Sequence, residues 1–90
     1  MYKLELSNKT FKFINSLRPK EKIRITQAFA KLCEDPYYSD SDIRKLKGHD
    51  SVYRLRIGNY RFLYKVDNDI LIIFMFDAGH RKDIYRYTIT

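Results

Sequence analysis

The apolar residues in the first third of the chain change from a strand period to a helix period. Residues 2–6, YKLEL, alternate apolar and polar positions as a half-buried strand does. Ser7 or Asn8 can cap a short helix that ends near residue 18. Pro19 suits the first turn of a second helix, which stops before Pro36 and repeats apolar residues at i, i+4, i+7 and i+8, namely Ile25, Phe29, Leu32 and Cys33. These residues predict a strand followed by a helical hairpin.

A β-hairpin is predicted around Gly58 and Asn59. Glycine tolerates the positive φ of a two-residue type I′ or II′ turn, and asparagine tolerates it better than most residues. With this pair as the loop, Arg56 lies opposite Arg61 and Leu55 opposite Phe62. Side chains alternate across a strand, so the hairpin has two unlike faces. One face is apolar and the other is basic, the first formed by Tyr53, Leu55, Ile57, Tyr60, Phe62 and Tyr64 and the second by Arg54, Arg56, Arg61, Leu63 and Lys65.

The remaining segments complete an α+β fold. Residues 37–50 are polar and predict a connecting loop, and residues 67–69, DND, predict a second turn. The unbroken apolar run 70–76, ILIIFMF, predicts a central strand that is buried on both faces. The predicted order is β-α-α-β-β-β, with the helical hairpin packed on the apolar face of a small antiparallel sheet. A short helical turn or tail follows at the C-terminus.

Composition limits the class of protein. Ninety residues are enough for one domain with a modest core, so the whole span 1–90 is expected to be a single domain. No apolar run approaches the length of a bilayer span, and residues 1–7 lack the apolar stretch of a signal peptide, which predicts a cytoplasmic protein that does not bind membranes. The single cysteine, Cys33, is expected to be a small buried thiol on a helix.

The net charge directs attention to the basic face. A formal charge of +7 favours a polyanionic partner, although a basic surface can also serve only solubility. Like charges directly opposite each other, as at Arg56 and Arg61, cost on the order of 0.2–1 kcal/mol. The fold does not require this arrangement. Because the planar guanidinium group binds phosphate oxygens in bidentate fashion, the face is interpreted as a phosphate-binding platform, assisted by the loop residues Lys45 and Lys47.

The C-terminal segment DAGHRKDIYRYTIT supplies side chains that can take part in catalysis. Arg81 and Tyr85 are four residues apart and share a face in a helical turn, and His80 precedes them. A lone histidine is more often structural than catalytic. The histidines, the single cysteine and the scattered carboxylates lack ligand spacing, so no metal site is predicted, and no other cofactor is expected.

The runs KLKG, YRLRIGNYRFLYKV, ILIIFMF and GHRKDIYRY together resemble the RelE/ParE superfamily of toxins from bacterial and archaeal toxin-antitoxin systems. The resemblance covers essentially the whole chain, and the superfamily has the element order predicted above. Its RelE-like branch cleaves mRNA in the ribosomal A site, whereas its ParE-like branch inhibits DNA gyrase. The resemblance favours the first branch. It also implies a cognate acidic antitoxin and a toxin-antitoxin hetero-oligomer.

The resemblance further implies roles for individual residues. Cleavage by attack of a 2′-hydroxyl on the scissile phosphate needs a base, an acid and positive charge on the phosphorane. Arg61 and Arg81 are expected to stabilise the phosphate, and Tyr85 is expected to stack on a base or transfer a proton. Arg54 and Arg56 are expected to hold the RNA backbone, with Lys45, Lys47 and Lys65 as further RNA contacts.

The proton donor and acceptor are the open part of this interpretation. RelE has lysines at the positions of Arg54 and Arg56, and arginine is a poor acid or base because it stays protonated. His80 is the candidate for proton transfer, with His49 as a weaker one. Two alternatives are a ParE-like gyrase inhibitor without nuclease activity and a noncatalytic RNA-binding module.

Overall fold

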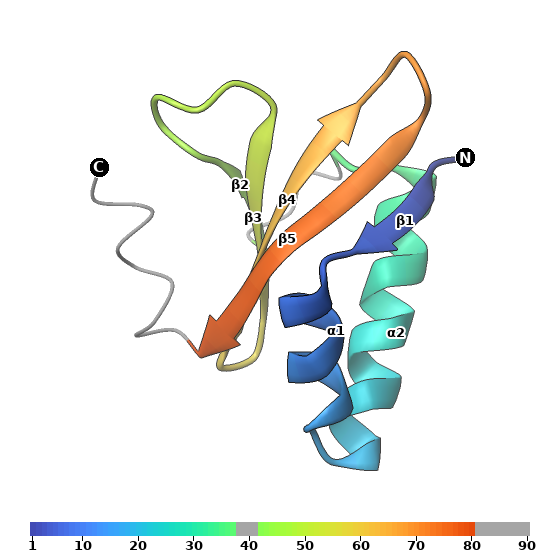
Figure 1. Ribbon diagram of the computed structural model, residues 1–90, viewed down its shortest axis with the longest axis vertical. Helices are drawn as coiled ribbons and strands as arrows, with labels where there is room; N and C mark the ends of the chain where they lie inside the picture. Colours follow the sequence, from blue (N-terminus) through green and yellow to red (C-terminus); the bar gives the residue numbers. More distant parts are fainter. Residues whose placement is uncertain (38–41, 81–90) are drawn as a thin grey trace.

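The computed structural model describes residues 1–37 and 42–80 and has an α+β architecture. Two helices pack on one face of a five-stranded sheet (Figure 1). The predicted class and the order of the predicted elements are confirmed, and one short strand is added. The elements are β1 (Lys3–Leu6), α1 (Asn8–Asn15), α2 (Pro19–Glu34), β2 (Ile43–Lys45), β3 (Val52–Ile57), β4 (Tyr60–Asp67) and β5 (Ile72–His80).

The helix ends follow local chemistry. The Ser7 side chain accepts a hydrogen bond from the backbone N–H of Thr10 at 3.2 Å, which caps α1. Helix α1 ends at Asn15, earlier than predicted, and the Ser16 hydroxyl then donates to the Phe13 carbonyl at 2.6 Å. Pro19 begins α2, where its missing N–H has no helical partner to lose. Caps and proline therefore separate the two helices.

The strand order is β1-β5-β4-β3-β2, and one pair in it is parallel. Strand β1 runs parallel to β5, while the other neighbouring strands are antiparallel. The expectation of a wholly antiparallel sheet is therefore wrong at this edge, because β1 and β5 pair across almost the full length of the sequence. The predicted loop 37–50 also contains a strand, β2, which pairs with β3 and forms the opposite edge.

The β3–β4 hairpin has the predicted register. Arg56 lies opposite Arg61 and Leu55 lies opposite Phe62. Gly58 has a φ of +59°, while Asn59 keeps a negative φ, which is the pattern of a type II′ turn. A Cβ atom at Gly58 would also lie 3.0 Å from Nη1 of Arg24, so the α2 side chain closely approaches this turn. Both the backbone conformation and the contact with α2 favour glycine here.

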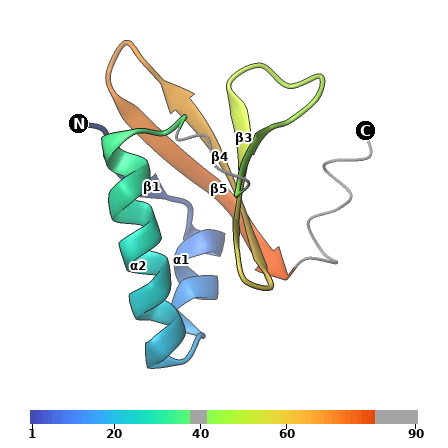
Figure 2. The same cartoon turned by 180° about the vertical axis from the view of Figure 1, so that it is seen from behind.

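The main core lies between the helices and the apolar face of the sheet, seen from behind in Figure 2. The Tyr64 hydroxyl donates to the Pro36 carbonyl at 2.8 Å, and burial raises the pKa of Tyr64 well above its ordinary value. The predicted apolar face of the hairpin is confirmed as part of this core. The buried residues of the main core are Ile25, Phe29, Leu32, Leu55, Ile57, Phe62, Tyr64, Val66, Ile73, Met75 and Ala78.

Strand β5 lies inside the sheet, as predicted, but it is not buried on both faces. Ile73 and Met75 face the helices and are fully buried. Phe74, between them, is 39% exposed on the other face. The unbroken apolar run therefore contains one buried row and one partly open row.

Candidate nucleic-acid interface

The sheet face that the helices do not cover carries a set of basic side chains from β2, β3 and β4. Arg44 lies opposite Arg54, and Arg56 lies opposite Arg61. Lys65 emerges from the same face farther along β4, opposite Val52 and Phe74. We call this set the arginine face, and its members are Arg44, Arg54, Arg56, Arg61 and Lys65.

Arg56, a member of the arginine face, forms an ion pair at the surface. Its Nε and Nη2 lie 3.3 and 3.2 Å from Oδ1 of Asp42. Both side chains are about half exposed, so the pair contributes little to stability. The ion pair therefore holds the Arg56 guanidinium only weakly in place.

Arg61 has a different setting, because it is buried. Its Nη1 donates to the carbonyls of Gly58 and Tyr60 at 3.3 and 3.1 Å. The side chain thereby holds the turn between β3 and β4, and only 5% of the residue is exposed. A buried charge costs free energy unless it is hydrogen-bonded, and these carbonyls satisfy part of that need. Arg61 therefore positions the hairpin, and its contact with a phosphate remains a prediction.

Apolar groups lie among the basic ones on this face. Leu63 packs with Leu46 and Val52 in a small second core, against which Phe76 also packs. The rings of Phe74 and Phe76 lie 6.4 Å apart at an angle of 31°. Phe74 is partly exposed and lies opposite Lys65. Exposed aromatic rings beside cations are a typical surface for stacking unpaired bases and contacting their phosphates.

A β-bulge changes the direction of the side chains at the end of β5. Leu63 pairs with Asp77 but the next residue, Tyr64, pairs with Met75, so Phe76 is an extra residue. The bulge turns Asp77 to the arginine face, where its carboxylate is almost fully buried. There Asp77 accepts a hydrogen bond from the backbone N–H of Ala78 and forms an ion pair with Lys9 of α1.

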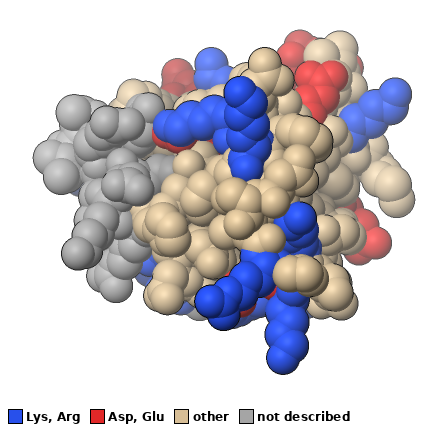
Figure 3. All heavy atoms as spheres, turned by 60° about the horizontal axis from the view of Figure 1, so that its bottom comes forward, with Lys and Arg blue, Asp and Glu red and all other residues tan. Residues whose placement is uncertain are grey.

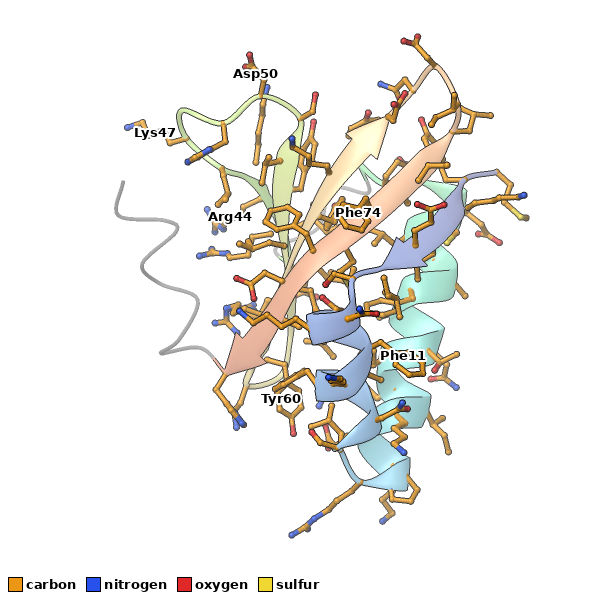
Figure 4. The ribbon with its side chains drawn as sticks, viewed as in Figure 1. Phe11, Arg44, Lys47, Asp50, Tyr60 and Phe74 are labelled. Carbon is orange, nitrogen blue, oxygen red and sulfur yellow. The ribbon has the colours of Figure 1, made fainter. Side chains whose placement is uncertain are left out.

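The same bulge places His80 on the helix side of the sheet. His80 pairs with Tyr60, and its ring centroid lies 5.5 Å from that of Tyr60 and 5.8 Å from that of Phe13. Tyr60 lies beside α1 (Figure 4). His80 therefore lies at the end of the strand next to β4 but on the other face from the arginine cluster, because one inserted residue reverses the alternation after position 76. Its role in proton transfer stays a prediction. His49 is exposed in the loop between β2 and β3.

Two neighbouring basic residues of β2 point to opposite faces of the sheet, which the sequence did not reveal. Lys45 pairs with Tyr53 and so lies on the opposite face from Arg44, which pairs with Arg54. Arg44 and Lys47 point away from the helices (Figure 4). Sequence reasoning selected Lys45 and missed Arg44, because a three-residue strand inside a polar segment gives almost no alternation. Arg81 and Tyr85 lie outside the described residues.

Basic side chains stand in separate groups on the surface viewed in Figure 3, with uncharged surface between them. No set of three or more potential metal ligands gathers within residues 1–37 and 42–80. No helix in the same ranges is long and apolar enough to cross a membrane. Burial raises the pKa of the Cys33 thiol, although the residue is only partly buried.

Comparison with known proteins gives consistent matches in sequence and in structure. The sequence pattern of the family described as "ParE toxin of type II toxin-antitoxin system, parDE" matches residues 7–85. The chain is 30% identical over 86 residues to the "Putative toxin RelE1" of Methanocaldococcus jannaschii, which covers 94% of this chain and 96% of that protein. It is 46% identical over 46 residues to the "Toxin RelE3" of the same organism, but that alignment spans only 51% of this chain and 50% of the relative.

A solved structure has the same fold. The crystal structure of the archaeal RelE-RelB complex from Pyrococcus horikoshii OT3 contains a chain that superimposes with a TM-score of 0.79 and 25% sequence identity. The superposition covers 89% of this chain and 94% of that one. The arginine face therefore lies on a scaffold shared over nearly its whole length.

Proposed function

The chain belongs to the ParE toxin family of type II toxin-antitoxin systems, within the RelE/ParE superfamily, and we propose that it is a RelE-like, ribosome-dependent mRNA endoribonuclease, in line with its similarity to RelE toxins. Its substrate is mRNA in the ribosomal A site, and cleavage proceeds by attack of a 2′-hydroxyl on the adjacent phosphate, without a metal ion. The activity belongs in the cytoplasm, where ribosomes translate mRNA. The observation that carries the proposal is the arginine face, which the helices leave uncovered.

The arginine face has the properties that a single-stranded RNA requires. Arg54 and Arg56 follow the same side of β3 and can hold successive phosphates, and Arg44 lies directly beside Arg54 on β2. Phe74 offers an exposed ring to an unstacked base. Guanidinium groups bind phosphate in bidentate fashion, and aromatic stacking tolerates any base. The positive charge is therefore suited both to hold RNA and to stabilise the phosphorane.

Proton transfer is assigned to groups other than His80. Its imidazole packs with Phe13 and Tyr60 on the helix side of the sheet, away from the phosphate-binding groups. We expect His80→Ala to retain ribosome-dependent cleavage within about threefold, because the imidazole lies against Phe13 and Tyr60 rather than beside the arginine face. A threefold change corresponds to less than about 1 kcal/mol in the barrier. A loss of 100-fold or more with the fold intact would return the role to His80. Arg81 and Tyr85 remain the proposed partners for phosphate stabilisation and for stacking or proton transfer.

The partner proposed for this toxin is an acidic antitoxin. The structural relative from Pyrococcus horikoshii OT3 is a RelE-RelB complex. A net charge of +7 on a small domain favours fast association with an acidic protein. The expected assembly is a toxin-antitoxin hetero-oligomer in which the toxin cannot act on mRNA.

Primer extension on ribosome-bound mRNA tests the nuclease. The wild-type protein is expected to produce breaks within the A-site codon, and the Arg54→Ala, Arg56→Ala double variant is expected to lose them. A matched control, Lys12→Ala with Lys20→Ala, removes two exposed charges from the helices and should cleave normally. Uncleaved mRNA with the wild-type protein, under conditions where a known RelE cleaves, would reject the proposal.

The second candidate is inhibition of DNA gyrase without nuclease chemistry. It is favoured by the match to the family described as ParE toxin. A gyrase supercoiling assay with the same three proteins separates the two functions. Inhibition of supercoiling together with intact mRNA would establish the ParE-like function, whereas breaks in the A site without effect on gyrase would establish the RelE-like one.

A further inference from the structure

The first turn of α1 is fixed to the edge of β5 at the β-bulge. Strand β1 ends at Leu6, opposite Met75, and beyond this point it no longer covers the edge of β5. The chain then enters α1 beside β5 (Figure 1), and the Ser7 N–H donates to the Met75 carbonyl at 2.9 Å. The Ser7 hydroxyl donates to the carbonyl of Phe76, the extra residue of the bulge, at 3.1 Å. The helix therefore begins at a defined place on the bulge.

Lys9, in this first turn, reaches the buried carboxylate of Asp77. The two side chains form an ion pair, but they differ in exposure, since 56% of the lysine side chain and 5% of the aspartate side chain are exposed. An ammonium group has three N–H donors, and one carboxylate oxygen takes one of them. The Lys9 ammonium therefore covers the carboxylate from the outside and can still donate to another acceptor.

The stability of α1 does not explain a lysine at this position. The N-terminus of a helix carries a partial positive charge, so a cation in the first turn is unfavourable. The first turn of α1 contains no acidic residue that would offset this effect. Lys9 therefore serves either the buried carboxylate of Asp77 or the surface on which its ammonium lies, and the two roles can be separated by experiment.

The Lys9 ammonium lies at the border of the arginine face. Asp77 pairs with Leu63, and Leu63 pairs with Arg54, so Asp77 and Arg54 belong to one row across the sheet. Two strand spacings of about 4.8 Å separate the backbones of these two residues. Arg61 lies two residues before Leu63 on the same side of β4. Because lysine and arginine have long side chains, one phosphate group can contact Lys9 and the arginine face together.

The arginines of this face cannot supply a proton for the reaction. A guanidinium group holds phosphate well, but it stays protonated and does not give a proton to a departing oxygen. A lysine ammonium is protonated at neutral pH and can release its proton, as general acid catalysis requires. Lys65 also lies on the arginine face, but it is opposite Phe74, farther along β4 from Arg61. Lys9 is the better placed of these two lysines.

We propose that Lys9 is the general acid of the cleavage reaction and that Asp77 is its positioning residue, a proposal that rests on the proposed nuclease function. The 2′-oxygen forms a bond to phosphorus and gives its proton to water, while the bond from phosphorus to the 5′-oxygen breaks. The departing 5′-oxygen takes a proton from the Lys9 ammonium, and the neutral amine regains a proton from the solvent. The products are a 2′,3′-cyclic phosphate and a 5′-hydroxyl group.

Single-turnover cleavage of ribosome-bound mRNA by Lys9→Arg tests the proposal. Arginine keeps the positive charge and the ion pair with Asp77, but it does not donate a proton. We expect cleavage about 100-fold slower than in the wild type, a typical contribution of general acid catalysis, with ribosome binding within about threefold. Lys20→Arg, at an exposed position near the start of α2, is the matched control and should cleave as the wild type does. Circular dichroism with thermal melting checks that both variants fold.

A modified substrate separates proton donation from every other role of Lys9. An mRNA with sulfur in place of the 5′-oxygen at the scissile bond releases a thiolate, which is far less basic than an alkoxide and departs without a proton. Lys9→Arg and the wild type should therefore cleave this mRNA at rates within about threefold of each other. Asp77→Asn keeps an oxygen for the Ala78 N–H but loses the ion pair. It should be about 10-fold slower on the oxygen substrate and regain the wild-type rate on the sulfur substrate.

Two results would overturn the inference and leave the proposed nuclease intact. Cleavage by Lys9→Arg at the wild-type rate would show that only the charge of residue 9 matters. An equal loss on the oxygen and sulfur substrates would assign Lys9 to RNA binding or to the fold. If the wild-type protein leaves ribosome-bound mRNA intact, the proposed nuclease and the role of Lys9 both fall.

Discussion

The two faces of the β3–β4 hairpin come from one alternating sequence but serve opposite purposes. Leu55 is 5% exposed and lies in the main core, while the next residue, Arg56, is exposed and pairs with a surface carboxylate. On β4, fully buried Phe62 follows Arg61, whose charge is held by backbone carbonyls. The helix side is therefore explained by folding alone. The arginine face is not, because it places Arg56 opposite Arg61 and Arg44 opposite Arg54.

This difference separates residues that maintain the structure from residues available for function. Hydrophobic burial gives about 25 cal/mol per Å² and accounts for the helix side. Cross-strand pairs of like charge are destabilising, so the pairs Arg56–Arg61 and Arg44–Arg54 are not explained by stability. Substitutions of buried residues should accordingly lower stability, whereas substitutions of the exposed basic residues of the arginine face should lower activity and leave stability nearly unchanged.

Removal of Phe62 should give the largest loss of stability. Phe62 is fully buried, and its ring contacts that of Phe29 at a centroid distance of 5.3 Å. Phe62→Ala should lower the free energy of unfolding by about 3–5 kcal/mol. Lys65→Ala, on the other face of the same strand, should change it by less than about 0.5 kcal/mol. Urea unfolding measures both, and similar losses in the two variants would refute the assignment of the faces.

Asp77 lies on the same side of the sheet as the arginine face, but its role is structural. Its buried carboxylate accepts from the Ala78 N–H at 2.9 Å and pairs with Lys9. Asp77→Ala should lower the free energy of unfolding by about 1–3 kcal/mol, because a buried N–H loses its partner. Lys9→Ala should cost less, since the lysine is half exposed. A variant at position 77 as stable as the wild type would mean that the bulge does not depend on this carboxylate.

The pH dependence of stability tests the helix side. Burial raises the pKa of Tyr64 above its ordinary value of 10.0, so the folded protein favours the neutral phenol. Below pH 10 the neutral Tyr64 phenol contributes fully to the stability of the folded protein. Above pH 10 the tyrosine of the unfolded chain loses a proton that the folded chain retains. Stability must therefore fall as the pH rises beyond about 10.

Tyr64→Phe is the matching variant. It should lower stability at pH 8 by about 1 kcal/mol, because the hydrogen bond to the Pro36 carbonyl is lost. Its further decline between pH 10 and 11 should be smaller than that of the wild type. Urea midpoints at pH 8, 9, 10 and 11 give the comparison, and parallel declines would show that Tyr64 is not the titrating group.

The hairpin and its two faces could be predicted because both features are local. A period of two and one glycine at position 58 fix the register, and the helices follow from Ser7, Pro19 and the apolar spacing. The parallel pairing of β1 with β5 could not be predicted, since its partners lie at opposite ends of the sequence. These long-range contacts leave no local pattern.

The candidate site could likewise be predicted where it depends on local alternation, and not elsewhere. Arg54, Arg56, Arg61 and Lys65 lie on the face that alternation assigned to them. The face on which His80 lies could not be predicted, because a bulge adds one residue to β5 and reverses every later side chain. Sequence reasoning also failed to separate Arg44 from Lys45, since β2 has only three residues.

Arg44 and Lys45 provide the most direct test of the central claim, that the arginine face is the surface that acts on RNA. They are neighbours in β2, both are exposed and both carry one positive charge, but they lie on opposite faces of the sheet. The measurement is the rate of A-site cleavage by Arg44→Gln and by Lys45→Gln under single-turnover conditions. We predict a loss of about 10-fold for Arg44→Gln, equivalent to about 1.4 kcal/mol, and a change of less than twofold for Lys45→Gln. Equal losses, or a loss confined to Lys45→Gln, would contradict the claim.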